Sequence, residues 1–424
     1  MIPLFFSSNM NLIKLEDIYR ARVRLSNIID HTPLQKNRRM SETYGCTVLL
    51  KREDLQAVRS YKIRGAFNKM ASLPSEELQR GIVCASAGNH AQGVAMACHE
   101  LKVRGTIYMP AVTPQQKIGK VRLFGRDWVD VQLIGDTFDD AYKAACGHAE
   151  QKEQTFIHPF DDPKIIEGQA TVGLEILEDS KAPIDYLLVP IGGGGLASGV
   201  GSIFQQLSPE TKIIGVEPAG APAMQQSLVQ GERIQLAEID PFVDGAAVRA
   251  VGHHTLNICS QTLDRVITVA EGAVCTTILK LYNEEGIVVE PAGALTITAL
   301  DILQEELQGK QVVCVVSGSN NDITRTEEIK ERALLYEGLK HYFLIRFPQR
   351  AGALREFLNL VLGPTDDITH FEYTKKNHRG AGPALVGIQV QSPADYAALI
   401  KRMESNQVNY QTLNDKSMLF EMLI

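Results

Sequence analysis

The stretch Tyr186-Leu187-Leu188-Val189-Pro190-Ile191-Gly192-Gly193-Gly194-Gly195-Leu196 decides the fold of this chain. Its first half is a short apolar run, which is typical of a strand buried on both faces. Four consecutive glycines then let the backbone approach an anion, and the helix predicted from about Leu196 would offer free N–H groups and a positive dipole end. The stretch therefore predicts a strand, a glycine loop and a helix, with a phosphate as the natural ligand.

The same pattern of strand, loop and helix recurs to about residue 330. Short apolar or β-branched runs predict strands at 47–51, 81–85, 106–109, 129–133, 186–190, 212–217, 265–269 and 311–316. Apolar residues at helical spacing predict helices at 15–29, 66–73, 91–101, 114–123, 138–151, 164–177, 273–285 and 292–307. This alternation predicts an α/β fold, in which a parallel sheet has helices on both faces and ligands bind beyond the carboxyl ends of the strands.

The order of predicted strands and helices changes after about Tyr336. Strand-like segments are predicted at 341–347, 368–374 and 384–390, helices at 353–362 and 393–403, a turn at 375–382 and a last apolar segment at 418–423. This order approaches βαββαβ, which is typical of one ferredoxin-like module. We therefore expect one domain of residues 1–335 and a second of residues 336–424.

Composition argues against several classes of protein. The 424 residues are 44% apolar and 22% charged, and a net charge of −7 without a long basic run argues against a nucleic-acid partner. No apolar run reaches the length of a membrane span, and Met1–Phe6 lacks the basic flanks of a signal peptide. Seven dispersed cysteines fit reduced, buried thiols in a cytoplasmic protein.

One lysine has unusual neighbours, in Ser60-Tyr61-Lys62-Ile63-Arg64-Gly65-Ala66. Most lysines are solvated surface charges, so Lys62 alone would indicate no function. Its combination with the glycine loop is informative, because a desolvated, neutral amine can form a Schiff base with an aldehyde cofactor while the loop binds the phosphate of that cofactor.

The glycine loop admits a second interpretation. Residues 192–197 also match the relaxed dinucleotide fingerprint, and Glu217 ends the next strand where an acid would contact a ribose. A nicotinamide dehydrogenase would use both features but would leave Lys62 unexplained. From the loop alone, a nucleotide and a smaller phosphate ligand both stay open.

Two polar loops follow other predicted strands. Ser86-Ala87-Gly88-Asn89-His90 could bind a carboxylate through hydroxyl and backbone groups, although a helix N-cap would have the same composition. His90 in such a loop is more typical of a structural support than of a catalytic base. Ser317-Gly318-Ser319-Asn320 ends the last strand, and a hydroxyl there could bond a heterocycle nitrogen, although a plain turn has the same composition.

Together these motifs resemble the threonine/serine dehydratase group of pyridoxal-phosphate enzymes, over about residues 15–330. The resemblance rests on residues 60–66, 86–93, 192–196, 290–294 and 317–320. It implies the two-subdomain, tryptophan synthase β-like fold, with a smaller subdomain of about residues 50–155 inserted in the larger one. The C-terminal module resembles the ACT-like regulatory domain, present as one copy, of short-form biosynthetic threonine dehydratase.

The resemblance also implies a role for each candidate residue. Lys62 would hold pyridoxal phosphate as a Schiff base and would be the catalytic base. The implied phosphate contacts are Gly192, Gly193, Gly194, Gly195 and Leu196. The implied ring contacts are Tyr61, where many relatives have phenylalanine, with Asn89, Gly245, Glu290 and Ser317. The implied substrate contacts are Ser86, Ala87, Gly88, Asn89 and His90.

Two departures from relatives refine these expectations. Some relatives bind a divalent metal through a glutamate and an aspartate six residues later, whereas here Glu217 is followed at that distance by Ala223. No tight divalent metal site of that type is therefore expected, whereas a monovalent cation stays open. Racemase relatives have a second serine where this chain has Ala87, so we expect poor racemisation, and substantial D-serine from L-serine would contradict this.

The implied reaction converts L-threonine, and also L-serine, to a 2-oxo acid and ammonia. Lys62 would remove the Cα proton, and the neutral Ser317 at the ring nitrogen would favour loss of the β-hydroxyl over reprotonation. The cofactor phosphate is the implied proton donor to that hydroxyl. The C-terminal module implies feedback inhibition by isoleucine, with valine as an activator, and the family implies an assembly of identical chains, expected to be a tetramer.

Several alternatives stay open from sequence. The module could serve assembly alone. The chain could be a serine dehydratase or threonine synthase of the same fold, a nicotinamide dehydrogenase, or an inactive amino-acid sensor. The regulatory module favours threonine dehydratase. A dehydrogenase would leave Lys62 and both serine-bearing loops unexplained, and the intact Lys62 and glycine loop argue against an inactive sensor.

Overall fold

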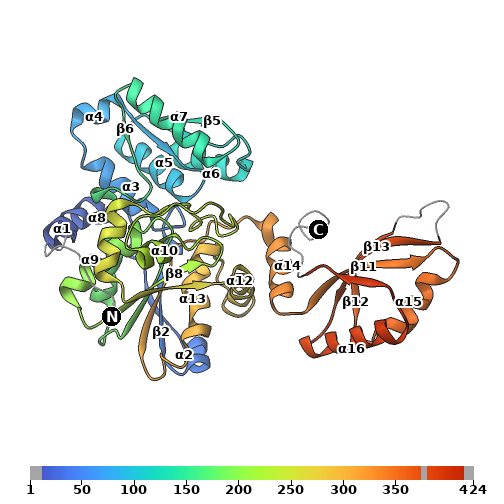
Figure 1. Ribbon diagram of the computed structural model, residues 1–424. Helices are drawn as coiled ribbons and strands as arrows, with labels where there is room; N and C mark the ends of the chain where they lie inside the picture. The colour runs from blue at the N-terminus through green and yellow to red at the C-terminus, as the bar shows by residue number, and fades with distance from the viewer. Residues whose placement is uncertain (1–11, 374–379, 415–424) are drawn as a thin grey trace. The chain divides into compact units, whose positions relative to one another are not determined.

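Two compact units make up the chain in the computed structural model, which describes residues 12–373 and 380–414. Their internal contacts divide it into Met1–Ile323 and Thr324–Ile424 (Figure 1). The division precedes helix α14 (Thr326–Tyr336), whereas the sequence predicted a boundary after it.

Three features discussed from sequence fall wholly or partly outside the described residues. They are the apolar start at 1–6, the last apolar segment at 418–423 and most of the turn at 375–382.

The first unit contains two parallel sheets, as predicted. The strands of the larger sheet, in spatial order, are β1 (Leu34–Asn37), β2 (Thr47–Arg52), β10 (Gln311–Val316), β7 (Tyr186–Pro190), β8 (Lys212–Pro218) and β9 (Arg265–Val269). Only the β1–β2 pair in this sheet is antiparallel. The strands of the smaller sheet are β5 (Val129–Leu133), β4 (Gly105–Met109), β3 (Ile82–Ala85) and β6 (Thr155–Phe156), all parallel.

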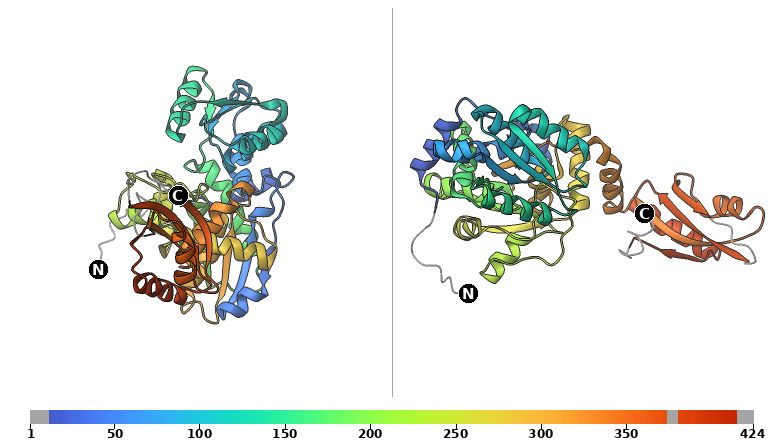
Figure 2. Two further views of the ribbon diagram at one scale, coloured as in Figure 1. Left: turned by 90° about the vertical axis from the view of Figure 1, so that its right-hand side faces the viewer. Right: turned by 90° about the horizontal axis from the view of Figure 1, so that it is seen from above.

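The smaller sheet belongs to a subdomain inserted in the larger one, which Figure 1 and the left view of Figure 2 show as a distinct body. Its helices are α3 (Lys62–Ala71), α4 (Ser75–Arg80), α5 (Asn89–Leu101), α6 (Gln115–Gly125) and α7 (Phe138–Gln151). The larger subdomain has α1 (Leu15–Leu25), α2 (Arg38–Tyr44), α8 (Pro163–Asp179), α9 (Gly195–Leu207), α10 (Ala223–Gln230), α11 (His253–Thr262), α12 (Glu271–Glu285) and α13 (Pro291–Leu303).

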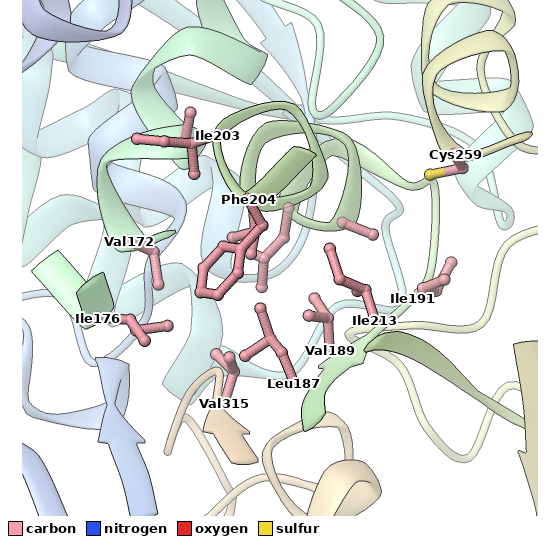
Figure 3. Packing of buried hydrophobic residues seen from close by; sticks show 14 of the residues in the cluster. Val172, Ile176, Leu187, Val189, Ile191, Ile203, Phe204, Ile213, Cys259 and Val315 are labelled. Carbon is pink, nitrogen blue, oxygen red and sulfur yellow. The ribbon is translucent and has the colours of Figure 1, made fainter. Parts of the chain in front are cut away.

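Helices cover both faces of the larger sheet because alternate residues of its strands point to opposite sides. On one side, Val315 of β10 packs with Leu187 of β7 and with Phe204 of α9 (Figure 3). On the other side, the Cys314 thiol lies 3.8 Å from the carbonyl oxygen of Thr296 in α13. The strands whose ends carry the candidate residues are therefore covered by helices on both faces.

Helix α8 packs closely against both α3 and α9. A Cβ atom on Gly168 would lie 2.5 Å from the carbonyl oxygen of Arg64 in α3, and one on Gly199 of α9 would lie 2.6 Å from the backbone nitrogen of Ala170. Glycine allows these backbones to approach, so the lysine helix and the helix after the glycine loop rest on one common support.

A buried ionic cluster surrounds Arg64, two residues after Lys62 in α3. All five N–H donors of the fully buried Arg64 guanidinium are used, on Glu53, Glu175 and the hydroxyl of Thr171, at 2.6 to 3.1 Å. Lys51, also fully buried, donates to Glu175 at 2.6 Å. Two cations thus balance two carboxylates, which is the condition under which charges tolerate burial.

The second unit has the predicted ferredoxin-like topology. After α14 its elements are β11 (Lys340–Pro348), α15 (Ala353–Val361), β12 (Asp367–Tyr373), β13 (Ala381–Gln389), α16 (Pro393–Ser405) and β14 (Tyr410–Thr412). The sheet order is β12-β13-β11-β14, and every pair is antiparallel. Within residues 12–373 and 380–414 no helix has the length and apolar character needed to cross a bilayer.

Candidate active site

Lys62 is the first residue of α3, and backbone contacts fix the segment before it to the end of β10. The Tyr61 N–H donates to the carbonyl oxygen of Ser317 at 3.2 Å, and Ser60 forms a β-bridge with Gly318. The Lys62 ammonium Nζ lies 2.8 Å from the carbonyl oxygen of Pro159 and 5.4 Å from the centre of the Tyr61 ring.

Burial lowers the pKa of the Lys62 amine to about 8, against the opposing attraction of Glu290. A substantial fraction of this amine is therefore neutral near physiological pH, and neutral amines are the nucleophilic form.

The glycine loop ends β7 and begins α9 with unpaired donors. Ser198 is the first residue there whose N–H bonds back along the chain, to the carbonyl oxygen of Gly194 at 2.9 Å. Among the described residues, the N–H groups of residues 192–197 have no hydrogen-bond acceptor. Six consecutive donors at a helix N-terminus form a site for an anion.

The neighbours and the backbone conformation of this loop explain why glycine is needed at Gly193 and Gly194. A Cβ atom on Gly193 would lie 2.3 Å from the Phe160 ring, and Gly194 has a positive φ of +92° that favours glycine. Leu196 is buried in the core next to α8, so only its backbone can face a ligand.

The loop at residues 86–90 ends β3 and begins α5 at Asn89. The Ser86 hydroxyl accepts from the Gly88 N–H at 3.2 Å, and a Cβ atom on Gly88 would meet nothing within 4 Å. The His90 ring nitrogen Nε2 lies 2.9 Å from the carbonyl oxygen of Ile157. Burial and the charge of Lys62 lower the pKa of His90 to about 3, so it is neutral at physiological pH and supports the loop.

The remaining candidates lie around Glu290, which precedes α13. The Asn89 side-chain amide donates to Glu290 at 2.6 Å. A Cβ atom on Gly245 would lie 3.3 Å from the same carboxylate and 2.8 Å from Cβ of Ala292. Ser317, at the end of β10, is only 2% exposed. The structure thus links Asn89, Gly245 and Glu290 directly, and the backbone pairs Ser317 with Tyr61.

Burial and the negative charge of Asp244 raise the pKa of Glu290 to about 7, although hydrogen bonds from Asn89 and from the Asn320 backbone lower it. The ionised carboxylate is therefore stabilised chiefly by those two donors and by nearby cations.

Sequence reasoning missed the segment His158-Pro159-Phe160-Asp161-Asp162. Pro159 accepts from Lys62, Phe160 packs on Gly193, and the Asp161 carboxylate accepts from three backbone N–H groups at the start of α11. Its only sequence signal was position, after a strand of two residues that is too short to produce a periodic pattern.

The dehydrogenase interpretation fails at Glu217. This side chain is fully buried, and its carboxylate accepts from the backbone N–H groups of Met224 and Gln225 at 2.7 and 2.8 Å, at the start of α10. A fully buried carboxylate that caps the start of α10 cannot reach a ribose, so Glu217 gives no support to a dinucleotide site.

Comparison with known families agrees with this geometry. Residues 25–318 match the family described as pyridoxal-phosphate dependent enzyme, and residues 331–423 match the C-terminal regulatory domain of threonine dehydratase. The chain belongs to the pyridoxal-phosphate-dependent enzymes.

Relatives within this family agree over the whole chain. The protein named L-threonine dehydratase biosynthetic IlvA from Halalkalibacterium halodurans is 55% identical over 415 residues, which are 98% of this chain and 100% of that protein. Its namesake from Bacillus subtilis is 53% identical over 98% of both chains. The structure of the processed form of threonine deaminase isoform 2 from Solanum lycopersicum is 37% identical, with a TM-score of 0.71 over 78% of this chain and 99% of that one.

The site described above fits the cofactor of this pyridoxal-phosphate-dependent family. The six unpaired N–H groups of residues 192–197 match a phosphate, and the half-buried Lys62 amine matches an aldehyde. Predicted fold class and cofactor are confirmed, whereas the individual site residues stay predictions.

We expect Gly193→Ala to weaken cofactor binding by at least about tenfold, because its Cβ would overlap the Phe160 ring and displace a loop that supplies N–H donors. Titration of the cofactor-free protein with pyridoxal phosphate, followed by absorbance, measures this. Gly147→Ala, in helix α7 with open space around it, is the matched control and should bind as the wild type does. If both variants bind pyridoxal phosphate equally well, the Phe160 ring moves aside and its contact with Gly193 does not affect cofactor binding.

Proposed function

We propose that this chain dehydrates and deaminates L-threonine to 2-oxobutanoate and ammonia, the first step of isoleucine biosynthesis. One observation supports it most directly. Lys62 donates to Pro159, whose neighbour Phe160 packs on Gly193, so the amine and the phosphate-binding loop meet across two adjacent residues. Full-length relatives named biosynthetic L-threonine dehydratase support the substrate.

Lys62 would hold pyridoxal phosphate covalently, and residues 192–196 would bind its phosphate. When bound, this cofactor supplies an electron sink for negative charge at the substrate Cα. The Lys62 amine, with a pKa near 8, is suited to take the Cα proton at Nζ. Ser317 carries no charge and cannot hold a ring nitrogen protonated as a carboxylate would, which favours elimination.

The substrate carboxylate would bind at the start of α5. The loop at 86–90 presents backbone N–H groups and the Ser86 hydroxyl there, and the helix dipole favours an anion. Tyr61 and Glu290 would lie beside the ring, and the buried, neutral His90 would keep the loop in place.

The deciding experiment is an absorbance spectrum of the purified protein with pyridoxal phosphate, followed by an assay of 2-oxo acid from L-threonine. We expect a band near roughly 410–420 nm, as for a protein-bound Schiff base, and product formation. Borohydride reduction and peptide mass analysis should then locate the cofactor on Lys62. Attachment to another lysine, or no band at all, would refute the proposal.

A serine dehydratase is the second candidate, since both reactions use the same residues. Parallel assays with L-threonine and L-serine decide between them, and we expect threonine to be the better substrate. Poor racemisation of L-serine is expected from Ala87, as argued from sequence.

The second unit is proposed to make the enzyme sensitive to inhibition by isoleucine and to activation by valine. The enzyme is proposed to be a tetramer of identical chains in the cytoplasm. The family match to a regulatory domain of threonine dehydratase supports an effector of this kind. Residues 350–354, at the turn between β11 and α15, and the strand near Phe371 are candidates for effector contact.

Truncation after residue 335 should remove isoleucine inhibition while dehydration continues within about threefold, because the candidate active site lies wholly in the first unit. Initial rates with and without isoleucine measure this, and the full chain in the same buffer is the control. Inhibition that persists in the truncated chain would place the effector site elsewhere.

A further inference from the structure

We propose that Lys120 and Asn320 are positioning residues, which fix the orientation of the Asn89 amide through a one-way chain of hydrogen bonds that ends at Glu290. No role was assigned to either residue from sequence. The inference rests on the proposed function, in which Asn89 contacts the cofactor ring.

Three short hydrogen bonds form the chain. Lys120 Nζ donates to Oδ1 of Asn320 at 2.9 Å, Nδ2 of Asn320 donates to Oδ1 of Asn89 at 2.7 Å, and Nδ2 of Asn89 donates to Oε1 of Glu290 at 2.6 Å. Each link joins two elements that are far apart in sequence, so the chain is a product of the fold.

The two ends of the chain set its direction. A lysine ammonium has only donors, and both oxygens of Glu290 accept here, Oε1 from the Asn89 amide and Oε2 from the Asn320 backbone N–H. A side-chain amide between them can satisfy both neighbours in one of its two orientations alone. Lys120 therefore selects the orientation of Asn320, Asn320 selects that of Asn89, and Glu290 closes the chain with the same polarity.

The other contacts of Asn320 hold it in place. Its Nδ2 also donates to the carbonyl oxygen of Val58 at 2.8 Å, and its backbone N–H donates to the second oxygen of Glu290 at 3.2 Å. Asn89 is left with one side-chain N–H that has no acceptor among the described residues. This N–H is the group that a ring oxygen of the cofactor would accept from.

The chain also crosses between the subdomains at every link. Lys120 in α6 and Asn89 in α5 belong to the smaller subdomain, whereas Asn320 follows β10 and Glu290 precedes α13 in the larger one. The Asn89 amide thus has its selected orientation only while the two subdomains keep this alignment.

Lys120→Met and Asn320→Asp test the proposal in the full chain. Methionine removes the donor at similar length, and aspartate places an acceptor where Asn320 donates, which opposes the orientation of Asn89. We expect each variant to bind pyridoxal phosphate about tenfold more weakly and to shift the absorbance maximum of the bound cofactor. Lys120→Arg keeps a donor and should restore both properties.

Lys117→Met is the matched control. Lys117 lies on the same helix and also reaches the larger subdomain, where it pairs with Asp244 at 2.6 Å, but it is not part of the chain. It should bind the cofactor within about twofold of wild type. Thermal unfolding of the cofactor-free proteins checks folding, and Lys120→Met decides alone if Asn320→Asp is unfolded.

The outcomes separate the two proposals. If Lys120→Met binds pyridoxal phosphate with the same affinity and spectrum as Lys117→Met, the role proposed for the hydrogen-bond chain is overturned. The proposed function is then still intact. A wild-type protein that binds no pyridoxal phosphate at Lys62 would instead overturn the proposed function.

Discussion

Replacing Lys62 by alanine is expected to lower kcat for L-threonine at least about 10³-fold and to abolish the band near roughly 410–420 nm. The same amine would attach the cofactor and move the Cα proton, so one substitution removes both. Lys120, the amine linked to Asn89 through Asn320, cannot readily replace Lys62 because it already donates to Asn320 at 2.9 Å. Lys143→Ala, a change of an exposed lysine in α7, should retain activity within about threefold.

The pH dependence of cofactor uptake adds a second measurement on Lys62. Its pKa is lowered from an ordinary 10.5 to about 8, so roughly 10% of the amine is neutral at pH 7, about 300-fold more than for an ordinary lysine. The rate of attachment to cofactor-free protein should therefore rise from pH 6 and level off above about pH 8. A rate that continues to rise through pH 10 would show that burial does not lower this pKa.

Arg64→Met is expected to cost about 3–5 kcal/mol of stability, because it leaves two buried carboxylates that have lost most of their compensating charge. For a unit of this size the unfolding midpoint should fall by on the order of 10 °C. Arg64→Lys should recover only part of the loss, since an ammonium cannot reproduce five N–H donors in a planar fork. Arg20→Met removes an exposed pair with Glu16 and should cost less than about 1 kcal/mol.

The pH dependence of the stability lost in Arg64→Met distinguishes an ionic role of the Arg64 cluster from a role in packing alone. Burial alone would raise the pKa of Glu175, but Arg64 and Lys51 outweigh it and hold that pKa below its ordinary value. A carboxylate with a depressed folded pKa stabilises the fold above its unfolded pKa, and that stability is lost as the pH falls through the folded pKa. The difference between wild type and Arg64→Met should therefore shrink toward acid pH, and a difference that does not change with pH would point to packing alone.

Sequence predicted the parallel sheets well because their strands are buried on both faces and produce continuous apolar runs. β7 and β10 are examples. The ferredoxin-like module was predicted equally well from the order of its strands and helices. The sequence expectation placed the domain boundary at about residue 335, at the end of α14. Contact between elements, which a sequence does not display, assigns it to the second unit.

The candidate site was predicted from unusual residues and from polar loops at the ends of predicted strands. Four glycines in succession and the motif around Lys62 stand out, whereas Phe160 has ordinary neighbours and Asn320 received no role within its loop. Their importance comes from long-range contacts, such as Phe160 with Gly193 and Asn320 with Asn89, that span more than thirty and more than two hundred positions. Glu217 shows the converse, since a plausible motif position proved to be a buried helix cap.

The close packing of α8 against two neighbours sets where this protein can tolerate variation. Because Gly168 and Gly199 let three helices share one set of backbone contacts, a larger residue at either position would change the spacing between the amine and the anion-binding loop at once. Libraries that aim to alter substrate preference should therefore keep these glycines constant. Substitutions should be placed in the loops at the carboxyl ends of the strands. A new side chain there can change which ligand is bound without changing the packing of the three helices.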